Sequence, residues 1–421
     1  MTLVFPKGKF ARDVAYLLGG SVTQSLFLFL VQILLANNLT LDEYGRLAFF
    51  NGLLLLFNII GTAGTAALLP ALARRRAAEG KAPPHAMLVW SVCFAALFAV
   101  ANIVAYAGGL YDGFGVRLDG LYFWMSATLF PVCVMVSIQA IFVGYGRTRL
   151  VFHAGIVLEA ARLAVVLLLI GTGGLSIGNL ILGWFALQAL ATLINLGAYL
   201  AWVRRFPEPF REAIRWTPHN VEALVYLVPS SAGAIMTRLL VFLTGVFHSS
   251  EETAVLNICL IFMSAFSILL APYQTALLSH FQQFRDAGDP GTFVKSAGRN
   301  MAVLIFLSAG AAYFGGRFWL EPLFGIPFPA VAGYLAALTL LFALDAPRAL
   351  FDVFFITFMR KRSLIAVESA KLAGVVAVFT AIPGSLRAQI LCVAVLGALA
   401  NLYKGGAAAA YLSGRMRDAL A

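Results

Sequence analysis

The chain has 421 residues, of which 61% are hydrophobic and only 12% are charged, and its mean hydropathy is +0.89. A soluble domain needs a far larger polar share to cover its surface, so this composition excludes one. The net charge of +11 would suit a nucleic-acid partner, but the positive charges lie in alternate loops between apolar runs. The sequence predicts an all-α polytopic membrane protein that binds no nucleic acid, metal or cofactor.

Twelve apolar runs reach the roughly 20 residues that cross a bilayer as a helix. We expect membrane spans at 14–36, 45–69, 86–109, 121–144, 150–170, 177–202, 221–247, 253–278, 297–316, 328–357, 363–382 and 388–412. The tenth span is long and holds Pro347 near its middle, which predicts a kink or a strong tilt there.

The two halves of the chain resemble each other. An offset of 210 positions lays Tyr16-Leu17 on Tyr226-Leu227, and an offset of 209 lays Glu159-Ala160-Ala161-Arg162 on Glu368-Ser369-Ala370-Lys371. We therefore expect two homologous lobes of six spans each, at 1–203 and 221–421, joined by a basic cytoplasmic linker at 204–220. Internal repeats of this kind are a usual way to build a transporter.

The distribution of Lys and Arg predicts the topology. One set of alternate loops and termini holds 21 of the 30 Lys and Arg residues, whereas the opposite set holds only Arg117, Arg317 and Arg387. By the positive-inside rule, both termini lie in the cytoplasm, which agrees with an even number of spans.

Charged residues within the apolar runs are the candidates for function, because a charge in hydrocarbon costs several kcal/mol unless it faces protein or water. Arg238, in the seventh span, has no acidic residue one turn away. It either pairs with an acid on another helix or contacts an anionic substrate in a central cavity. We favour the cavity, because an unpaired arginine is a poor structural element.

In the tenth span, Asp345, Arg348 and Asp352 follow the spacing i, i+3 and i+7, so they share one helical face. They form either a neutralised structural cluster or a protonation or cation site that couples transport to an ion gradient. Both interpretations stay open at this point.

Other charges near or within the spans have simpler explanations. The pairs Glu159/Arg162 and Glu368/Lys371 have i, i+3 spacing at the same place in the repeat, which favours self-neutralising intramembrane ion pairs. Lys404 is expected to extend toward the cytoplasm. Arg46, at the external end of the second span, is either an interfacial anchor or the rim of a positive cavity.

The first hairpin, Leu35 to Gly80, resembles the N-terminal signature of bacterial polysaccharide-biosynthesis membrane proteins. The matching features are a short acidic turn that leads into Tyr44-Gly45, and the stretch Gly61-Thr62-Ala63-Gly64 before basic residues. The segment Gly144–Leu150, GYGRTRL, is similar to a short Gly-Arg turn of that family. This resemblance points to the multidrug/oligosaccharidyl-lipid/polysaccharide (MOP) exporter superfamily, in the branch of O-antigen-type flippases.

The resemblance implies a protein of the bacterial inner membrane that turns a polyprenyl-diphosphate-linked oligosaccharide from the cytoplasmic to the periplasmic leaflet. It implies two lobes that rock between inward-open and outward-open states about a cationic cavity. Arg238, Arg46 and Arg348 are then the expected substrate contacts, and Asp345 and Asp352 the residues that couple transport to H⁺ or Na⁺. Membrane lipids and polysaccharide-assembly proteins are the expected partners.

Two other functions compete with a flippase. A cation-coupled exporter of small amphipathic compounds would need acids in both lobes, and the first lobe has few. A membrane glycosyltransferase or polymerase would need a sizeable external loop, whereas the predicted external loops are short and the repeat would have no explanation.

Overall fold

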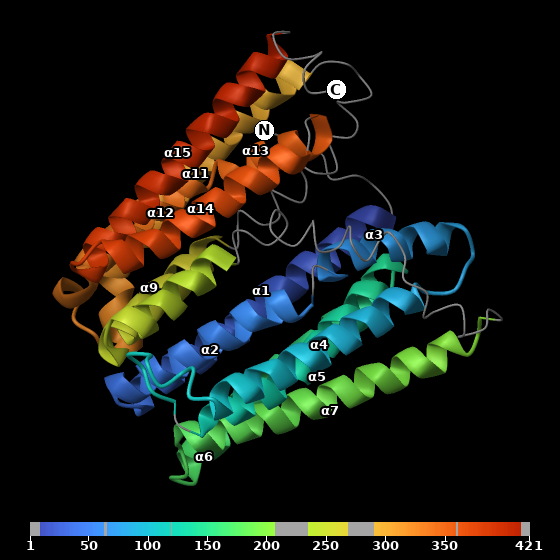
Figure 1. The fold of residues 1–421 in the computed structure, drawn as a ribbon, viewed down its shortest axis with the longest axis horizontal. Helices are drawn as coiled ribbons and strands as arrows, with labels where there is room; N and C mark the ends of the chain where they lie inside the picture. Colours follow the sequence, from blue (N-terminus) through green and yellow to red (C-terminus); the bar gives the residue numbers. More distant parts are fainter. Residues whose placement is uncertain are drawn as a thin grey trace. The chain divides into compact units, whose positions relative to one another are not determined.

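The computed structural model describes residues 9–62, 65–118, 120–206, 235–267, 290–358 and 361–413, and every regular element among them is an α-helix (Figure 1). Nine of these helices are long and apolar enough to cross a membrane, a count that covers the described residues alone. The chain divides into two compact units, residues 1–246 and 247–421, which are taken in turn below.

The first unit is built around α5. Its helices are α1 (Lys9–Asn38), α2 (Leu41–Gly61), α3 (Thr65–Ala78), α4 (His85–Ala107), α5 (Leu121–Gly144), α6 (Thr148–Gly171), α7 (Ile177–Val203) and the helix Ile235–Phe247, whose last residue falls beyond the unit boundary. Helix α5 contacts α2, α3, α4, α6 and α7, and α1 packs along α6. Because α5 is surrounded by protein, its apolar side chains form much of the core of this unit.

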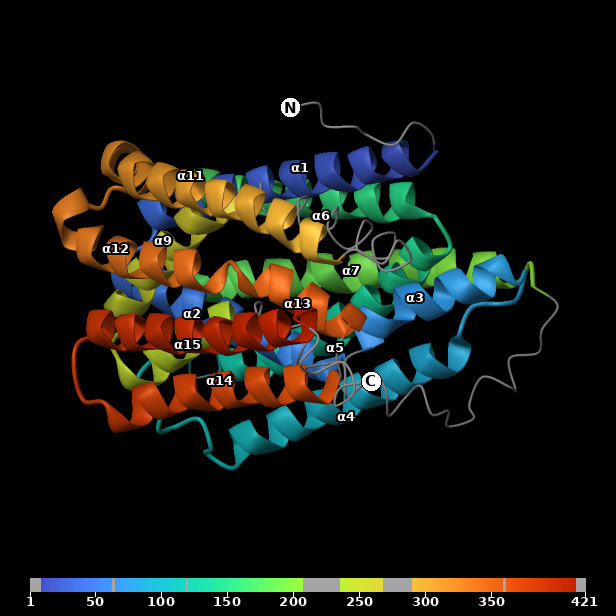
Figure 2. The same cartoon turned by 90° about the horizontal axis from the view of Figure 1, so that it is seen from above.

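The second unit contains α9 (Ser250–Ser267), α11 (Pro290–Phe324), α12 (Phe328–Asp345), α13 (Arg348–Phe358), α14 (Lys361–Ala381) and α15 (Leu386–Leu412). Helix α12 packs against α9, α11 and α15, while α13 and α14 both contact α15. Figure 2 shows α14 and α15 running side by side. The meeting of α12, α13, α14 and α15 positions the charged residues of this unit.

Most helix bounds agree with the predicted spans to within five residues, but α11 extends seven or eight residues past each end of the span predicted at 297–316, and two other spans differ in form. Residues 221–234 of the seventh predicted span, 268–278 of the eighth and 207–220 of the predicted linker lie outside the described residues. The predicted span 45–69 consists of two helices, because α2 ends at Gly61 and α3 begins at Thr65. The tenth span is divided between α12 and α13 at Pro347, where the sequence predicted a kink or a strong tilt, because proline lacks the N–H that an unbroken helix requires.

The helix caps support the predicted repeat. Helix α15 occupies the bounds of α7 displaced by 209 positions. The side chain of Ser176 accepts a hydrogen bond from the backbone N–H of Asn179 at the start of α7, and Ser385 accepts one from Ala388 at the start of α15. The same side chain therefore caps both helices at the same place in the two halves.

A second pair of caps follows the same offset. The Thr40 hydroxyl accepts from the N–H of Glu43, 3.2 Å away, and the Ser249 hydroxyl accepts from the N–H of Glu252, 3.1 Å away. The Glu43 carboxylate also accepts from the Thr40 N–H, which completes a capping box at the start of α2. This box extends α2 to Leu41, four residues before the predicted start of the span.

The compact units and the predicted lobes divide the chain at different places. The units divide after Val246, so the described part of the seventh predicted span, 235–246, groups with the first unit. This helix lies close to α2, because a Cβ atom added to Gly52 would be 2.8 Å from Val241 Cγ1. The stacked rings of Phe49 and Phe242, with centroids 6.0 Å apart, belong to the same contact.

Candidate functional site

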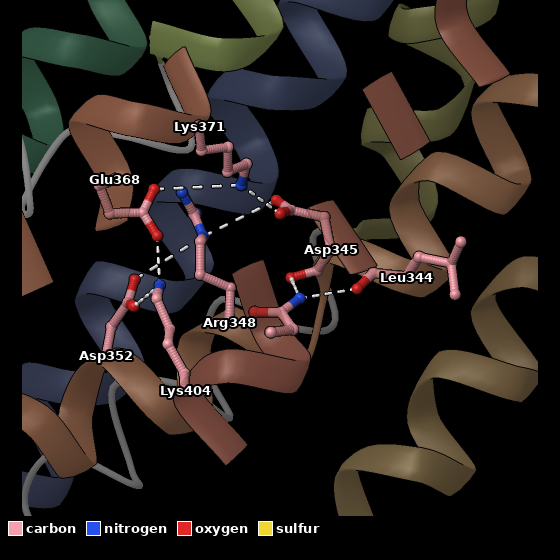
Figure 3. A network of polar contacts seen from close by, with 8 residues as sticks. Leu344, Asp345, Arg348, Asp352, Glu368, Lys371 and Lys404 are labelled. Carbon is pink, nitrogen blue, oxygen red and sulfur yellow. Dashed lines mark hydrogen bonds and ion pairs between the residues drawn. The ribbon is translucent and has the colours of Figure 1, made fainter. Parts of the chain in front are cut away.

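Six charged side chains gather in the second unit where the break in the tenth span brings four helices together (Figure 3). Pro347 ends α12 at Asp345, and the chain resumes as α13 at Arg348. Helices α14 and α15 supply the remaining members. We call this group the ionic network, and its members are Asp345, Arg348, Asp352, Glu368, Lys371 and Lys404.

Lys404 joins two acids of the network. Its ammonium group donates to Asp352 Oδ1, 2.5 Å away on α13, and to Glu368 Oε1 on α14. The side chains of Lys404 and Glu368 are both 0% exposed. A fully buried charge is tolerated only when it is paired, and here one ammonium serves two carboxylates from two helices.

The other two bases bind the acid at the break. The Lys371 ammonium donates to Asp345 Oδ1, and the Arg348 Nε atom lies 3.7 Å from Asp345 and 3.8 Å from Asp352. Asn401 of α15 donates to the Leu344 carbonyl at 2.7 Å, which satisfies an acceptor near the end of α12. The network thus fixes both sides of the helix break to α14 and α15.

The charges of the network cancel, because it contains three carboxylates and three cationic groups. Two of its buried atoms, Glu368 Oε2 and Arg348 Nη1, have no hydrogen-bond partner among the described residues. Arg348 lies between two acids of its own chain, Asp345 and Asp352. The proposed roles of Arg348 in substrate binding and of Asp345 and Asp352 in ion coupling remain predictions.

Lys371 and Glu368 form the expected i, i+3 ion pair, with their charged atoms 4.0 Å apart, and each also has a closer partner on another helix. Lys404 was expected to extend toward the cytoplasm, but its side chain is buried between two carboxylates. In both cases the acid closest to the lysine ammonium lies on a different helix.

The equivalent place in the first unit carries a single ion pair. Arg162 Nη1 lies 2.7 Å from Glu159 Oε1 on the same helix, α6, as the spacing predicted. Arg162 Nη2 also donates to Gln188 Oε1 of α7 at 3.1 Å. These two charged side chains are 26% and 16% exposed, so the pair is less enclosed than its counterpart.

Arg238 lies on the helix Ile235–Phe247 of the first unit and is partly buried. Arg238 lies nine positions before the last residue of this helix, which corresponds to about 14 Å along the axis. Within the described parts of the chain, its guanidinium has neither an ion pair nor a hydrogen bond. The structure therefore places a cationic group inside a predicted span without a described acid beside it.

Arg46 lies near the start of α2, where it pairs with Asp42 at 2.9 Å. Both side chains are nearly half exposed. Together with Arg117, Trp124 and four other residues, Arg46 lines a pocket of about 400 Å³ in the first unit. Its position agrees with both sequence predictions, an interfacial anchor and the rim of a positive cavity.

The basic cluster after α3 is partly neutralised by one acid. Glu79 lies 2.8 Å from the Lys81 ammonium and 3.2 Å from Arg75 Nε, and it is solvent-exposed. The hydrogen bond from Lys81, and then the one from Arg75, lower the pKa of the Glu79 carboxyl below its ordinary value. This carboxylate therefore stays ionised and organises the turn that follows α3.

Solved structures with this arrangement of helices are known. An inward-facing multidrug resistance MATE family transporter of the MOP superfamily has a TM-score of 0.73 and 12% identity, with 94% of this chain and 96% of that one covered. The fold is that of the MATE transporters. An outward-facing multidrug resistance MATE family transporter has a TM-score of 0.65 and 12% identity, with 96% of this chain and 95% of that one covered.

A third similar structure is a MOP superfamily transporter from Pyrococcus furiosus, whose binding pocket is described as having a reverse polarity that suggests a different function. Its TM-score is 0.64 at 12% identity, with 96% of this chain and 95% of that one covered. No family model matches the sequence, and no curated protein is significantly similar to it. The predicted fold class, an all-α membrane protein of the MATE/MOP type, is confirmed.

Proposed function

We propose that this protein is an alternating-access transporter, and that it turns a polyprenyl-diphosphate-linked oligosaccharide from the cytoplasmic to the outer leaflet of the bacterial inner membrane. This step would serve the assembly of a cell-surface polysaccharide such as O-antigen. The observation that carries the proposal is Arg238, a partly buried guanidinium with no acid beside it in the described structure. The fold supports a transporter, because the similar solved structures are transporters.

The chemistry of the headgroup explains why such an arginine is needed. A diphosphate cannot enter hydrocarbon unaided, because transfer of its charge from water costs many kcal/mol. A guanidinium presents a planar fork of donors that binds two phosphate oxygens at once. Arg238 would hold the diphosphate partway across the membrane while the lipid tail remains in the bilayer. Arg46 would contact the headgroup near the external surface.

The main rival is a cation-coupled exporter of small amphipathic compounds, since the similar solved structures include multidrug resistance transporters. A cationic substrate of such an exporter requires carboxylates that are free to bind it. In α12 to α15, the three carboxylates of the ionic network are matched by three cationic groups of the chain itself. This balance favours an anionic substrate over a cationic one.

A leaflet-translocation assay tests the proposal. The purified protein is reconstituted in liposomes with a fluorescent polyprenyl-diphosphate oligosaccharide, and the label that reaches the opposite leaflet is quenched over time. Removal of one charge-assisted phosphate contact corresponds to a loss of roughly tenfold or more. We expect this loss in Arg238→Gln and a smaller one in Arg238→Lys, which keeps the charge without the fork.

Arg46→Gln is the matched control, because it removes an arginine that is nearly half exposed and already paired with Asp42. It should reduce the rate much less than Arg238→Gln. Equal rates for wild type and Arg238→Gln would contradict the role of Arg238. A wild-type protein that moves no lipid-linked sugar but expels a cationic dye would replace the flippase with the exporter.

A further inference from the structure

Two carboxylates from different helices converge on one point in the second unit. Asp352 of α13 and Glu368 of α14 are both within hydrogen-bonding distance of a single group, the Lys404 ammonium of α15. Two carboxylates that converge in a buried place form the kind of oxygen-lined site that binds a small hard cation. In this chain, a covalently attached cation already occupies that position (Figure 3).

The charge balance leaves no requirement for a second cation. Asp345 and Asp352 are also contacted by Arg348, and Asp345 by Lys371, so the network is neutral as it stands. A sodium ion added to it would leave a net positive charge in a group whose central members are fully buried, which is unfavourable. Glu368 Oε2 is buried and already lacks a hydrogen-bond donor among the described residues, and loss of the Lys404 ammonium would leave Oε1 of the same carboxylate without its donor as well.

The first unit shows that the fold does not require a lysine at this place. At the repeat offset of 209, Asn195 of α7 corresponds to Lys404 of α15. Asn195 is buried and uncharged, and its amide donates to the carbonyl of Ala191 on its own helix. The ammonium is therefore a special feature of the second unit and is matched there by two acids.

We propose that Lys404 acts as a tethered cation that fills a latent sodium-type site formed by Asp352 and Glu368. The second unit consequently binds no mobile Na⁺ between Asp352 and Glu368, and coupling of transport to Na⁺ would need a site elsewhere. Removal of the ammonium converts the network into a site for Na⁺. This inference is independent of the substrate carried, so its test and the translocation assay can fail separately.

The test measures the thermal unfolding of the full-length protein in detergent, in sodium chloride and in choline chloride of equal ionic strength. The wild type should unfold at the same temperature in both salts. Lys404→Met should unfold earlier in choline and regain about 3 °C or more in sodium, because an ion that binds the folded state alone raises Tm. The double variant Lys404→Met/Glu368→Gln restores neutrality and should lose this sodium dependence.

Two results would overturn the inference. One is a wild-type Tm that rises in sodium and loses that response in Asp352→Asn, since a mobile cation would then bind beside the lysine. The other is a folded Lys404→Met protein that behaves identically in both salts. If Lys404→Met yields no folded protein, Lys404→Gln retains donors for the carboxylates without the charge, and its Tm must show the same sodium dependence.

Discussion

The charged residues within the predicted spans are paired differently at equivalent places in the two units. In the first, α6 carries one acid and one base that neutralise each other at 2.7 Å, and α7 adds only a neutral glutamine. In the second, the acid and base of α14 bind different helices, and α15 adds a lysine that is fully buried. The pair in the first unit is local, whereas the network in the second joins four helices across a break.

This difference indicates what each unit can do. A local ion pair constrains a single helix, so its loss should affect the rest of the unit little. A network that crosses helices ties the two halves of the broken span to α14 and α15, and its loss exposes buried charge. The second unit is therefore expected to depend on its charges for stability, whereas Arg238 of the first unit is the charge that we propose contacts a substrate.

The largest expected effect comes from Lys404→Met. It leaves Glu368, which is 0% exposed, and Asp352 without their shared ammonium, and breaking a buried pair in this way costs about 3–5 kcal/mol. Chemical unfolding in mixed micelles measures this loss, with Asn195→Met in the first unit as the matched control. A loss for Lys404→Met no greater than that for Asn195→Met would remove the distinction between the units.

A smaller loss is expected when the pair in the first unit is broken. Arg162→Met removes one ion pair and the hydrogen bond to Gln188. Because both charged side chains are partly exposed, the free energy of unfolding should fall by about 1–2 kcal/mol. A loss equal to that of Lys404→Met in the same micelles would show that the first-unit pair is as critical as the network.

The shared caps should behave alike in the two units. Ser176→Ala and Ser385→Ala each remove a side chain that accepts from a backbone N–H at the start of α7 or α15. Each substitution should cost about 1 kcal/mol, the usual effect of losing such a cap. Thermal unfolding of the two variants measures this, and a clear difference between them would argue that the repeat is not energetically equivalent at this place.

The smallest effect is expected at Asp42, whose side chain is 45% exposed and pairs with Arg46. Exposed ion pairs contribute little, because solvent screens them and long side chains lose freedom when they pair. Asp42→Asn should change the free energy of unfolding by less than about 0.5 kcal/mol. A larger loss that salt suppresses would show that Arg46 lies in a more enclosed environment than its exposure suggests.

Most of the fold follows from local features of the sequence. The span predicted at 121–144 is α5 with the same bounds, and the interruption at Pro347 appears between α12 and α13. Apolar runs, prolines and capping residues act over a few positions, so the sequence alone reveals them. The start of α2 was placed late because its first turn is polar and is held by the capping box of Thr40.

The candidate site was less accessible to sequence reasoning. The pairing of Glu159 with Arg162 follows the i, i+3 rule and was predicted, but Lys404 lies 36 and 52 positions from its two partners. Spacing rules describe neighbours on one helix and contain no information on which faces of different helices meet. The neutral balance of the charges was the available signal, because buried acids in a membrane require bases.

The central claim, that the first unit presents a cationic group to an anionic headgroup, is tested most directly by ligand-induced stabilisation. Thermal unfolding of the wild type and Arg238→Gln would be compared with a short polyprenyl diphosphate and with the corresponding neutral polyprenol. We predict that the diphosphate alone stabilises the wild type and that Arg238→Gln loses this effect. Equal stabilisation of both proteins by the diphosphate, or none of the wild type, would contradict the claim.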